Sequence, residues 1–337
     1  MIFDDNEFLI NLDVDGGDNA PISVLKGAEL YLSKNQNVKF NLYGRKSIIV
    51  SFIKDLPLLA KLSNIIDCEG VIDGSLKPSD AMKKEFRNSS LAKSIASLKN
   101  QPNQATVSSG NTGAMMAYSK VYLRTIESIS RPAIASLFPS KNHPVCFLDL
   151  GANSECDENN LVDFAIMGSI YYSILFPNST AKVSLLNIGS EEAKGNAIIQ
   201  KTHDLLKNKN SINYNGFIEA NEITDTENNI IVTDGFTGNI TLKTAEGISK
   251  FFTDSLKKHL LSNFLSKVFT FFLKSNLKAF KNSIDPRNFN GGIFLGINGV
   301  VIKSHGNADD YAFCNAIGFA VKCLESNLLK KIKENAK

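Results

Sequence analysis

Short apolar segments alternate with helical segments along almost the whole chain, and this alternation limits the possible folds more than any other feature. Apolar strands are predicted over residues 8–14, 38–43, 64–67, 105–108, 133–138, 145–150, 182–188, 213–217 and 229–233. Helices are predicted between them, including residues 20–33, 47–59 and 115–123. Such alternation is typical of parallel sheets, because parallel strands need a long crossover connection. We therefore predict one α/β domain over residues 1–337, with a largely parallel sheet sandwiched by helices (α/β/α).

The composition narrows the class of protein. The 337 residues are 43% hydrophobic, which is enough for a full core. The 37 basic and 34 acidic side chains leave a net charge of +3, which argues against a nucleic-acid partner. The cysteines are scattered without a CxxC pair, and no run of about 20 uncharged apolar residues is present. We expect a cytoplasmic protein with reduced thiols.

Polar, glycine-bearing loops follow five of the predicted strands, at residues 13–19, 108–114, 149–153, 187–196 and 234–239. In open α/β sheets, ligands bind at the carboxyl ends of strands. A helix that starts in such a loop presents unpaired N–H groups and a positive dipole end, which suit phosphate. Each loop taken alone is also compatible with a plain helix start. Taken together, they predict five loops that converge on one edge of the sheet and bind an anion.

Several ordered motifs resemble those of one known family. They are Gly16-Gly17-Asp18-Asn19-Ala20-Pro21, Ser109-Gly110-Asn111-Thr112-Gly113-Ala114, Arg131-Pro132-Ala133-Ile134-Ala135, Asp149-Leu150-Gly151-Ala152-Asn153, Leu186-Asn187-Ile188-Gly189 with Lys194-Gly195-Asn196, Asp234-Gly235-Phe236-Thr237-Gly238-Asn239, and Asn298-Gly299-Val300-Val301-Ile302 with Ser304-His305-Gly306. The chain resembles PlsX-type phosphate acyltransferases from about Phe8 to Ile332. It departs from them at Asn19, where the family often has histidine.

The resemblance implies a reaction and partners. Acyl-[acyl carrier protein] and inorganic phosphate would give acyl-phosphate and free carrier protein, in fatty acid and phospholipid synthesis. It also implies a homodimer whose fold is similar to phosphotransacetylases and to isocitrate and isopropylmalate dehydrogenases. No cofactor is expected.

Four side chains are candidates for catalysis: Lys194, Asn239, Asp234 and His305. Phosphate is already largely dianionic near pH 7, so the site needs positioning groups and oxyanion stabilisation more than a strong base. Lys194 is expected to neutralise charge, or else to be a solvated lysine. Asn239 and Asp234 either serve the site or cap a helix. His305 either assists the departing thiolate or is structural.

The predicted phosphate and substrate contacts lie in the same loops. They are Gly16, Gly17, Asp18, Ser109, Gly110, Asn111, Thr112, Gly113, Asn153, Gly189, Asn196 and Gly238. Asn111 and Asn153 either donate N–H groups to a ligand or cap helices. Asp13, Asp15 and Asp18 crowd the first loop, and we favour a structural role for at least one of them. We predict no metal site.

Residues 250–281 differ in character from the rest of the chain. Seven lysines against Asp254 give this segment a local charge of +6, among many phenylalanines and leucines. Basic amphipathic helices of this kind lie on anionic membranes. We predict a helical insertion at a dimer or membrane surface, with Phe269, Phe271 and Phe272 in contact with the inner face of the membrane. The basic surface also suits an acidic carrier protein.

Two other functions are compatible with parts of the sequence. A decarboxylating dehydrogenase of the same fold needs clustered aspartates and arginines, but the five arginines are dispersed. A non-enzymatic scaffold at the membrane surface, binding carrier protein, explains residues 250–281 but leaves the five loops without a role.

Overall fold

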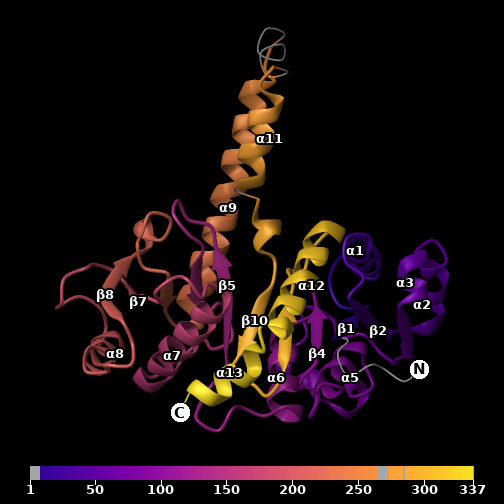
Figure 1. The fold of residues 1–337 in the computed structure, drawn as a ribbon, viewed down its shortest axis with the longest axis horizontal. Helices are drawn as coiled ribbons and strands as arrows, with labels where there is room; N and C mark the ends of the chain where they lie inside the picture. Colours follow the sequence, from indigo (N-terminus) through magenta and orange to yellow (C-terminus); the bar gives the residue numbers. More distant parts are fainter. Residues whose placement is uncertain (1–7, 264–269, 271, 284, 337) are drawn as a thin grey trace.

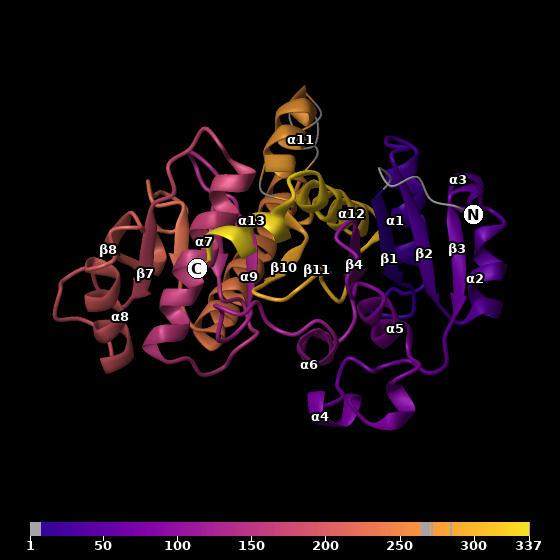
Figure 2. The same cartoon turned by 60° about the horizontal axis from the view of Figure 1, so that its bottom comes forward.

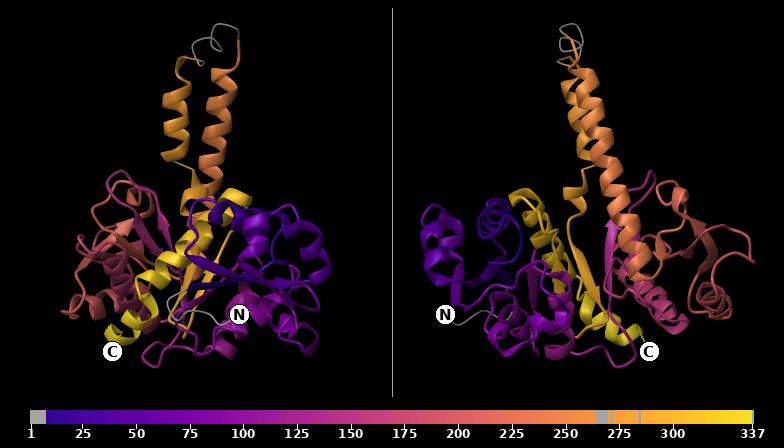
Figure 3. Two further views of the ribbon diagram at one scale, coloured as in Figure 1. Left: turned by 45° about the vertical axis from the view of Figure 1, so that its right-hand side comes forward. Right: turned by 180° about the vertical axis from the view of Figure 1, so that it is seen from behind.

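The computed structural model describes residues 8–263, 270, 272–283 and 285–336. Its strands form one central sheet with helices on both faces, as the alternation in the sequence predicted (Figure 1). A helical hairpin projects from the body of the molecule beside the sheet (Figures 1 and 3). The α/β/α class is therefore confirmed.

The strands are β1 (Phe8–Asp13), β2 (Val38–Gly44), β3 (Ser63–Asp67), β4 (Gln104–Ser108), β5 (Ala133–Phe138), β6 (Val145–Leu148), β7 (Val183–Asn187), β8 (Tyr214–Glu219), β9 (Ile230–Val232), β10 (Gly292–Leu295) and β11 (Val300–Lys303). The helices are α1 (Ile22–Leu32), α2 (Lys46–Ile53), α3 (Pro57–Lys61), α4 (Pro78–Ala81), α5 (Ser90–Ala96), α6 (Thr112–Tyr122), α7 (Glu158–Leu175), α8 (Ala197–Lys207), α9 (Gly235–Leu260), α11 (Lys274–Ser283), α12 (Asp310–Glu325) and α13 (Leu328–Asn335). Short 3₁₀ turns lie at Lys84–Phe86, Ala220–Glu222 and Pro286–Phe289.

The sheet has 11 strands in the order β3-β2-β1-β4-β11-β10-β5-β6-β9-β7-β8. Strands β3, β2, β1, β4 and β11 run parallel, and so do β6, β9, β7 and β8. Between these two groups, the pairings β11–β10, β10–β5 and β5–β6 are antiparallel. Three successive reversals leave the two parallel groups pointing in opposite directions.

Two apolar clusters cover the two faces of the sheet. One contains residues of α1, α7, α12 and α13, and the other contains residues of α5 and α6 with Leu242 of α9 (Figure 2). The strands between them are buried on both sides, which explains their continuous apolar runs. Burial of both faces is what holds the strand-end loops in place.

The helix predicted over residues 47–59 is divided into α2 and α3. Pro57 opens α3, and the residue before a proline is disfavoured in the α region, so the helix ends earlier. Strands β10 and β11 were not predicted.

Helix α9 begins directly after β9 and continues for 26 residues into the projecting hairpin. The segment predicted as helical from residue 250 is thus the outer part of a longer helix, which returns as α11. Phe269 and Phe271 lie outside the described residues. Within the described residues, no helix has the length and apolar character needed to cross a membrane.

Candidate functional site

The five polar loops do not all share one edge, so that prediction was wrong in part. Four of them still contribute to one cavity, through Gly17, Ser109, Leu150 and Asn239, whereas the loop at residues 187–196 does not. The loops after β1 and β4 leave one end of the sheet, whereas those after β6, β7 and β9 leave the opposite end. The cause is the antiparallel β10 and β5, which reverse the second parallel group. The carboxyl-end rule holds within each group but not across both.

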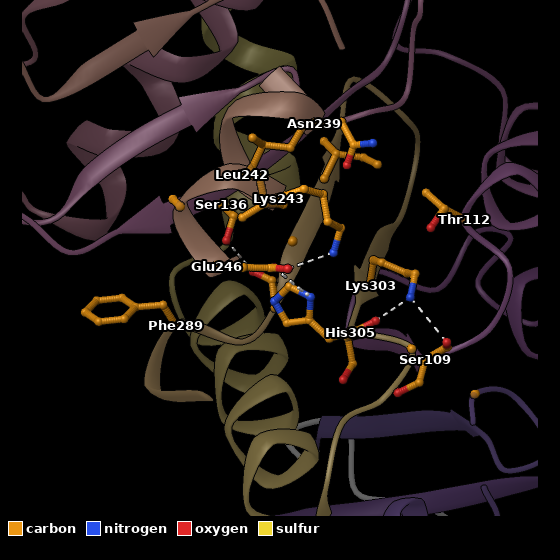
Figure 4. Close-up of a pocket in the computed structure, with 18 of the residues that line it drawn as sticks. Ser109, Thr112, Ser136, Asn239, Leu242, Lys243, Glu246, Phe289, Lys303 and His305 are labelled. Carbon is orange, nitrogen blue, oxygen red and sulfur yellow. Dashed lines mark hydrogen bonds and ion pairs between the residues drawn. The ribbon is translucent and has the colours of Figure 1, made fainter. Parts of the chain in front are cut away.

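A cavity of about 1030 Å³ lies where α9 passes over the loops that follow β1, β4 and β11 (Figure 4). Its polar part includes Asp18, residues 109–112 and residues 303–306. Its other wall is one side of α9, where Asn239, Lys243 and Glu246 project into the space. Asn239 also packs beside Gly151, so it joins the cavity to the second group of loops. Ligand pockets are typically of this size and mixed character.

The loop between β4 and α6 is built on a buried carboxylate. Asp13 Oδ1 accepts a hydrogen bond from Ser90 Oγ at 2.5 Å, and its Oδ2 accepts one from Ser108 Oγ at 2.6 Å. Ser108 Oγ in turn accepts the Gly110 N–H at 2.9 Å. Burial raises the pKa of Asp13 to about 6, against the lowering effect of both serines. Asp13 therefore has the structural role predicted for one acid of the first loop.

The other acids of the first loop also have protein partners. Asp15 accepts from the backbone N–H of Arg45 at 3.1 Å and pairs with its guanidinium at 3.2 Å. Asp18 donates its backbone N–H to the Gly306 carbonyl at 2.8 Å. Asn19, at the family's frequent histidine position, donates from Nδ2 to the backbone oxygen of Asn307 at 2.9 Å. The bonds of Asp18 and Asn19 fasten the first loop to the loop after β11, and those of Asp15 fasten it to the residue that follows β2.

The first loop and the β4–α6 loop approach each other closely at Gly17. Its φ is +110°, and a Cβ there would lie 2.6 Å from the Cβ of Ser109. Only glycine fits both the conformation and the contact. Beside it, Ser109 Oγ is buried and has no hydrogen-bond partner among the described residues. A buried hydroxyl next to the start of α6 is a ready donor for an anion.

Lys303, the last residue of β11, supplies positive charge to this part of the cavity. Its Nζ donates to the Ser109 carbonyl at 3.2 Å and to the Ser304 carbonyl (Figure 4). Burial lowers the pKa of Lys303 to about 8; Asp13 opposes that effect and Lys243 adds to it. At pH 7 the ammonium is still mostly charged, so it can bind a phosphate oxygen.

Glu246, His305 and Lys243 form a second polar group across from Lys303. His305 Nδ1 lies 3.5 Å from Glu246 Oε1, and Lys243 Nζ lies 2.9 Å from Glu246 Oε2 (Figure 4). Burial lowers the pKa of His305 from its usual 6.5, while the Glu246 carboxylate raises it and the two lysines lower it. The imidazole is therefore neutral at pH 7 and able to accept a proton.

The structure brings only part of the predicted site together. The predicted site residues that line the cavity are Gly17, Asp18, Ser109, Gly110, Asn111, Thr112, Asn239 and His305. Those outside its lining are Gly16, Gly113, Asn153, Gly189, Lys194, Asn196, Asp234 and Gly238. For Gly16 and Gly238 the reason for glycine is packing, since a Cβ would lie 2.2 Å from Asp13 Oδ2 and 1.9 Å from the Asp149 carbonyl, respectively.

Asn111, Asn153 and Asp234 have the capping or bracing contacts that the sequence left open, and Asn196 caps a helix as well. Asn111, Asn196 and Asp234 each accept a backbone N–H at the start of α6, α8 and α9. The amide of Asn111 donates to three loop carbonyls, and that of Asn153 to the Pro132 carbonyl and Asp149. Their N–H groups are thus already engaged, and substrate contact by these residues stays a prediction.

Sequence reasoning missed Lys303, Lys243 and Glu246. A signal existed for each of them. Lys303 directly precedes the Ser304-His305-Gly306 motif. Lys243 and Glu246 follow Asn239 by four and seven residues, which places them on the same side of a helix.

Lys194 lies in the exposed loop after β7, in the second group of loops. Its catalytic role stays a prediction, and Lys194→Ala tests it. We expect turnover to fall by roughly 10²-fold, as for loss of one group that stabilises the oxyanion. The free energy of unfolding should stay unchanged, because the side chain is exposed. Steady-state rates together with urea unfolding measure both; a near-normal rate would identify Lys194 as a solvated surface residue.

Comparisons with known proteins identify the family of the chain. A family model described as "Fatty acid synthesis protein" matches residues 8–331. The phosphate acyltransferase of Pelagibacter ubique (strain HTCC1062) is 41% identical over 328 residues, covering 97% of this chain and 98% of that protein. The phosphate acyltransferase of Wolbachia pipientis wMel is 40% identical over 332 residues, covering 97% and 96%.

Solved structures share the fold at low identity. A phosphotransacetylase from Streptococcus pyogenes superposes with a TM-score of 0.64 at 14% identity, covering 95% of this chain and 94% of that one. The EutD phosphotransacetylase from Staphylococcus aureus gives a TM-score of 0.61 at 15% identity, with the same coverage. The extent and identity of the sequence matches carry the assignment: this chain belongs to the phosphate acyltransferase family and is an acyltransferase.

Proposed function

We propose that the protein transfers an acyl group from acyl carrier protein to inorganic phosphate, forming acyl-phosphate and free carrier protein. The observation that carries this proposal is the anion site of Lys303, the unpartnered Ser109 Oγ and the α6 N-terminus, which faces a neutral histidine across one cavity. Phosphate binds to Lys303, to the Ser109 hydroxyl and to the N–H groups at the start of α6. The thioester carbonyl carbon lies beside the phosphate, and His305 is within reach of both the phosphate proton and the thioester sulfur.

The chemistry balances without a cofactor. An oxygen of the monohydrogen phosphate dianion attacks the carbonyl carbon, and His305 accepts the proton of that phosphate. The tetrahedral intermediate collapses, the C–S bond breaks, and the imidazolium returns the proton to the departing sulfur. The products are the acyl-phosphate dianion and a free thiol. Lys303 holds the nucleophile, and Glu246 orients the imidazole and stabilises its charged form.

Phosphate-dependent thiol release tests the function. Acylated carrier protein incubated with the enzyme should release free thiol only when phosphate is present, and acyl-phosphate should accumulate in equal amount. Neither nicotinamide nor a metal should be needed. Without phosphate-dependent release the function is wrong; loss of activity with a chelator and recovery with Mg²⁺ would refute only the metal-free reaction.

The dehydrogenase alternative is not favoured. It needs arginines that clamp a dicarboxylate, and none of the described residues that line the cavity is an arginine. Arg45 is paired with Asp15, and Arg287 is paired with Asp285 and Asp309.

We further propose that the hairpin of α9 and α11 binds an anionic membrane and that its lysines also meet the acidic carrier protein. Phe251 is 72% exposed and Phe272 is 77% exposed, and Lys250, Lys257 and Lys258 are exposed on α9. Large apolar side chains beside lysines favour an anionic lipid surface. This would place the enzyme at the inner face of the membrane, peripherally bound.

Sedimentation with vesicles tests the membrane proposal. The protein should pellet with phosphatidylglycerol vesicles, and less so as salt rises, because lysine attraction is screened. Phe271→Ser combined with Phe272→Ser should abolish pelleting while turnover in solution persists. A double variant that still pellets would place the contact elsewhere.

We also propose that the protein is a homodimer. The double variant of Phe271 and Phe272 tests whether those rings lie in the dimer contact. Phe236 and Ile240, in the first turns of α9, are exposed in the single chain and offer an apolar surface for a second copy. Analytical ultracentrifugation should give twice the chain mass of 36.9 kDa. If the phenylalanine double variant became monomeric and inactive, those rings would belong to the dimer contact instead of the membrane.

A further inference from the structure

The cavity continues beyond its polar centre into an apolar arm. The arm is lined by Phe138, Pro139, Ile248, Phe252, Phe280 and Phe289. These residues come from β5 and the turn after it, from α9, from α11 and from the 3₁₀ turn before β10. None of the described residues that line this arm is charged. The arm therefore suits an uncharged, apolar occupant.

Helix α9 connects the polar centre to the arm along one side. Glu246 faces His305, and Ile248, Ser249 and Phe252 follow it along the cavity at helical spacing. From Glu246 to Phe252 the helix advances by about 9 Å. An extended alkyl chain of medium length covers that distance. At the far end, the rings of Phe252 and Phe280 meet edge to face with centroids 6.4 Å apart.

Three apolar side chains of the arm, all from the helical hairpin, are open to solvent in the single chain. Ile248 is 62% exposed, Phe252 is 53% exposed and Phe280 is 41% exposed. Contiguous exposed apolar surface beside a polar site is typical of a ligand-binding groove. Because the arm is continuous with the space between Lys303 and His305, its occupant extends from the reacting group.

We propose that the arm binds the acyl chain of the thioester substrate, with the chain lying against Ile248 and Phe252 while the carbonyl lies at the polar centre. This assignment rests on the proposed function, which requires an acyl group at that centre. The arm then favours acyl chains long enough to enter it over short ones, because each methylene that leaves water improves binding.

Two variants and one matched control test the assignment kinetically. Ile248→Asp places a charge in the arm, and Ser249→Phe fills it without a charge. Thr244→Asp also introduces one negative charge on the same helix, at an exposed position that does not line the cavity. With palmitoyl carrier protein, kcat/KM should fall by about 10-fold or more for both arm variants, the equivalent of about 1.4 kcal/mol. With butyryl carrier protein it should fall less than about 2-fold, since few methylenes reach the arm. The control should keep the wild-type ratio of the two substrates.

A binding measurement that needs no turnover separates this inference from the proposed function. Fluorescence titration with cis-parinaric acid should give a Kd at least about 10-fold higher for Ile248→Asp and Ser249→Phe than for the wild type or Thr244→Asp. Equal losses with palmitoyl and butyryl substrates would mean that the arm holds the pantetheine portion, and would overturn the inference. So would unchanged parinaric acid binding in both variants. Wild-type protein that binds parinaric acid at the arm but shows no phosphate-dependent thiol release would refute the function alone.

Discussion

Replacing Lys303 with Met should lower kcat/KM for phosphate by roughly 10²- to 10³-fold, the range for removing one group that stabilises developing charge in a closed site. The physical reason is the position of its ammonium, which donates to the Ser109 carbonyl. This places the positive charge beside the start of α6 and beside the buried Ser109 hydroxyl, which has no hydrogen-bond partner among the described residues. Phosphate titrations in the thiol-release assay measure the loss. Lys120→Met, on the exposed surface of α6, is the matched control and should be near normal.

The pH dependence of kcat/KM for phosphate is a second test of the role of Lys303. Burial lowers the pKa of Lys303 to about 8, so its charge is lost as the pH rises through that value. In the wild type, kcat/KM for phosphate should therefore decline above about pH 8. Lys303→Arg should remove this decline, because a guanidinium stays charged throughout the range. A wild-type profile that remains flat to high pH would show that Lys303 does not hold the phosphate.

Replacing His305 with Gln should lower kcat by roughly 10²- to 10⁴-fold, the usual contribution of a positioned acid–base group. Glutamine keeps hydrogen-bonding capacity at this site but cannot carry the proton from phosphate to sulfur. Rates with small acyl thioesters of an acidic aryl thiol and of a less acidic alkyl thiol report the role: the defect should be smaller when the departing thiol is acidic. Equal defects with both thiols would make His305 a structural residue.

Glu246→Gln separates orientation of the imidazole from simple packing. The Glu246 carboxylate raises the pKa of His305, against the lowering effects of burial and of the lysines. Removing that charge should lower the pKa of His305 further, so the acidic limb of the rate profile should move to lower pH. Turnover at pH 7 should fall less than in His305→Gln. If the acidic limb did not move, Glu246 would have no effect on the titration of His305, and its role would be limited to the ion pair with Lys243.

Much of the local structure could be predicted from the sequence. The strand predicted at residues 133–138 is β5 without a change of boundary, and the turn before α6 was located by its serine, asparagine and glycine residues. Local pattern suffices for such elements, since apolar runs and capping residues act over a few positions. The helix predicted over residues 47–59 is interrupted before Pro57, because the residue before a proline is disfavoured in the α region.

The two missed strands changed the site more than any boundary did. β10 and β11 are four residues each and lie among glycines, so neither carries a clear periodic pattern. Yet β11 places Lys303 and His305 beside the β4 loop, and the antiparallel β10 separates the two parallel groups. For that reason the five loops do not all converge, and the second group reaches the cavity only through Leu150 and Asn239.

The sequence alone determined the α/β/α class, the loops at the strand ends and the membership of the family, because burial on both faces and glycine-bearing turns leave direct traces in the order of residues. Only the tertiary structure decided which loops meet. Strand direction and neighbour depend on pairings such as Val301 with Thr106, almost two hundred residues apart, and no local pattern encodes them. The juxtaposition of Lys303 with Ser109, and of His305 with Glu246, follows from those pairings and from the path of α9 across the sheet.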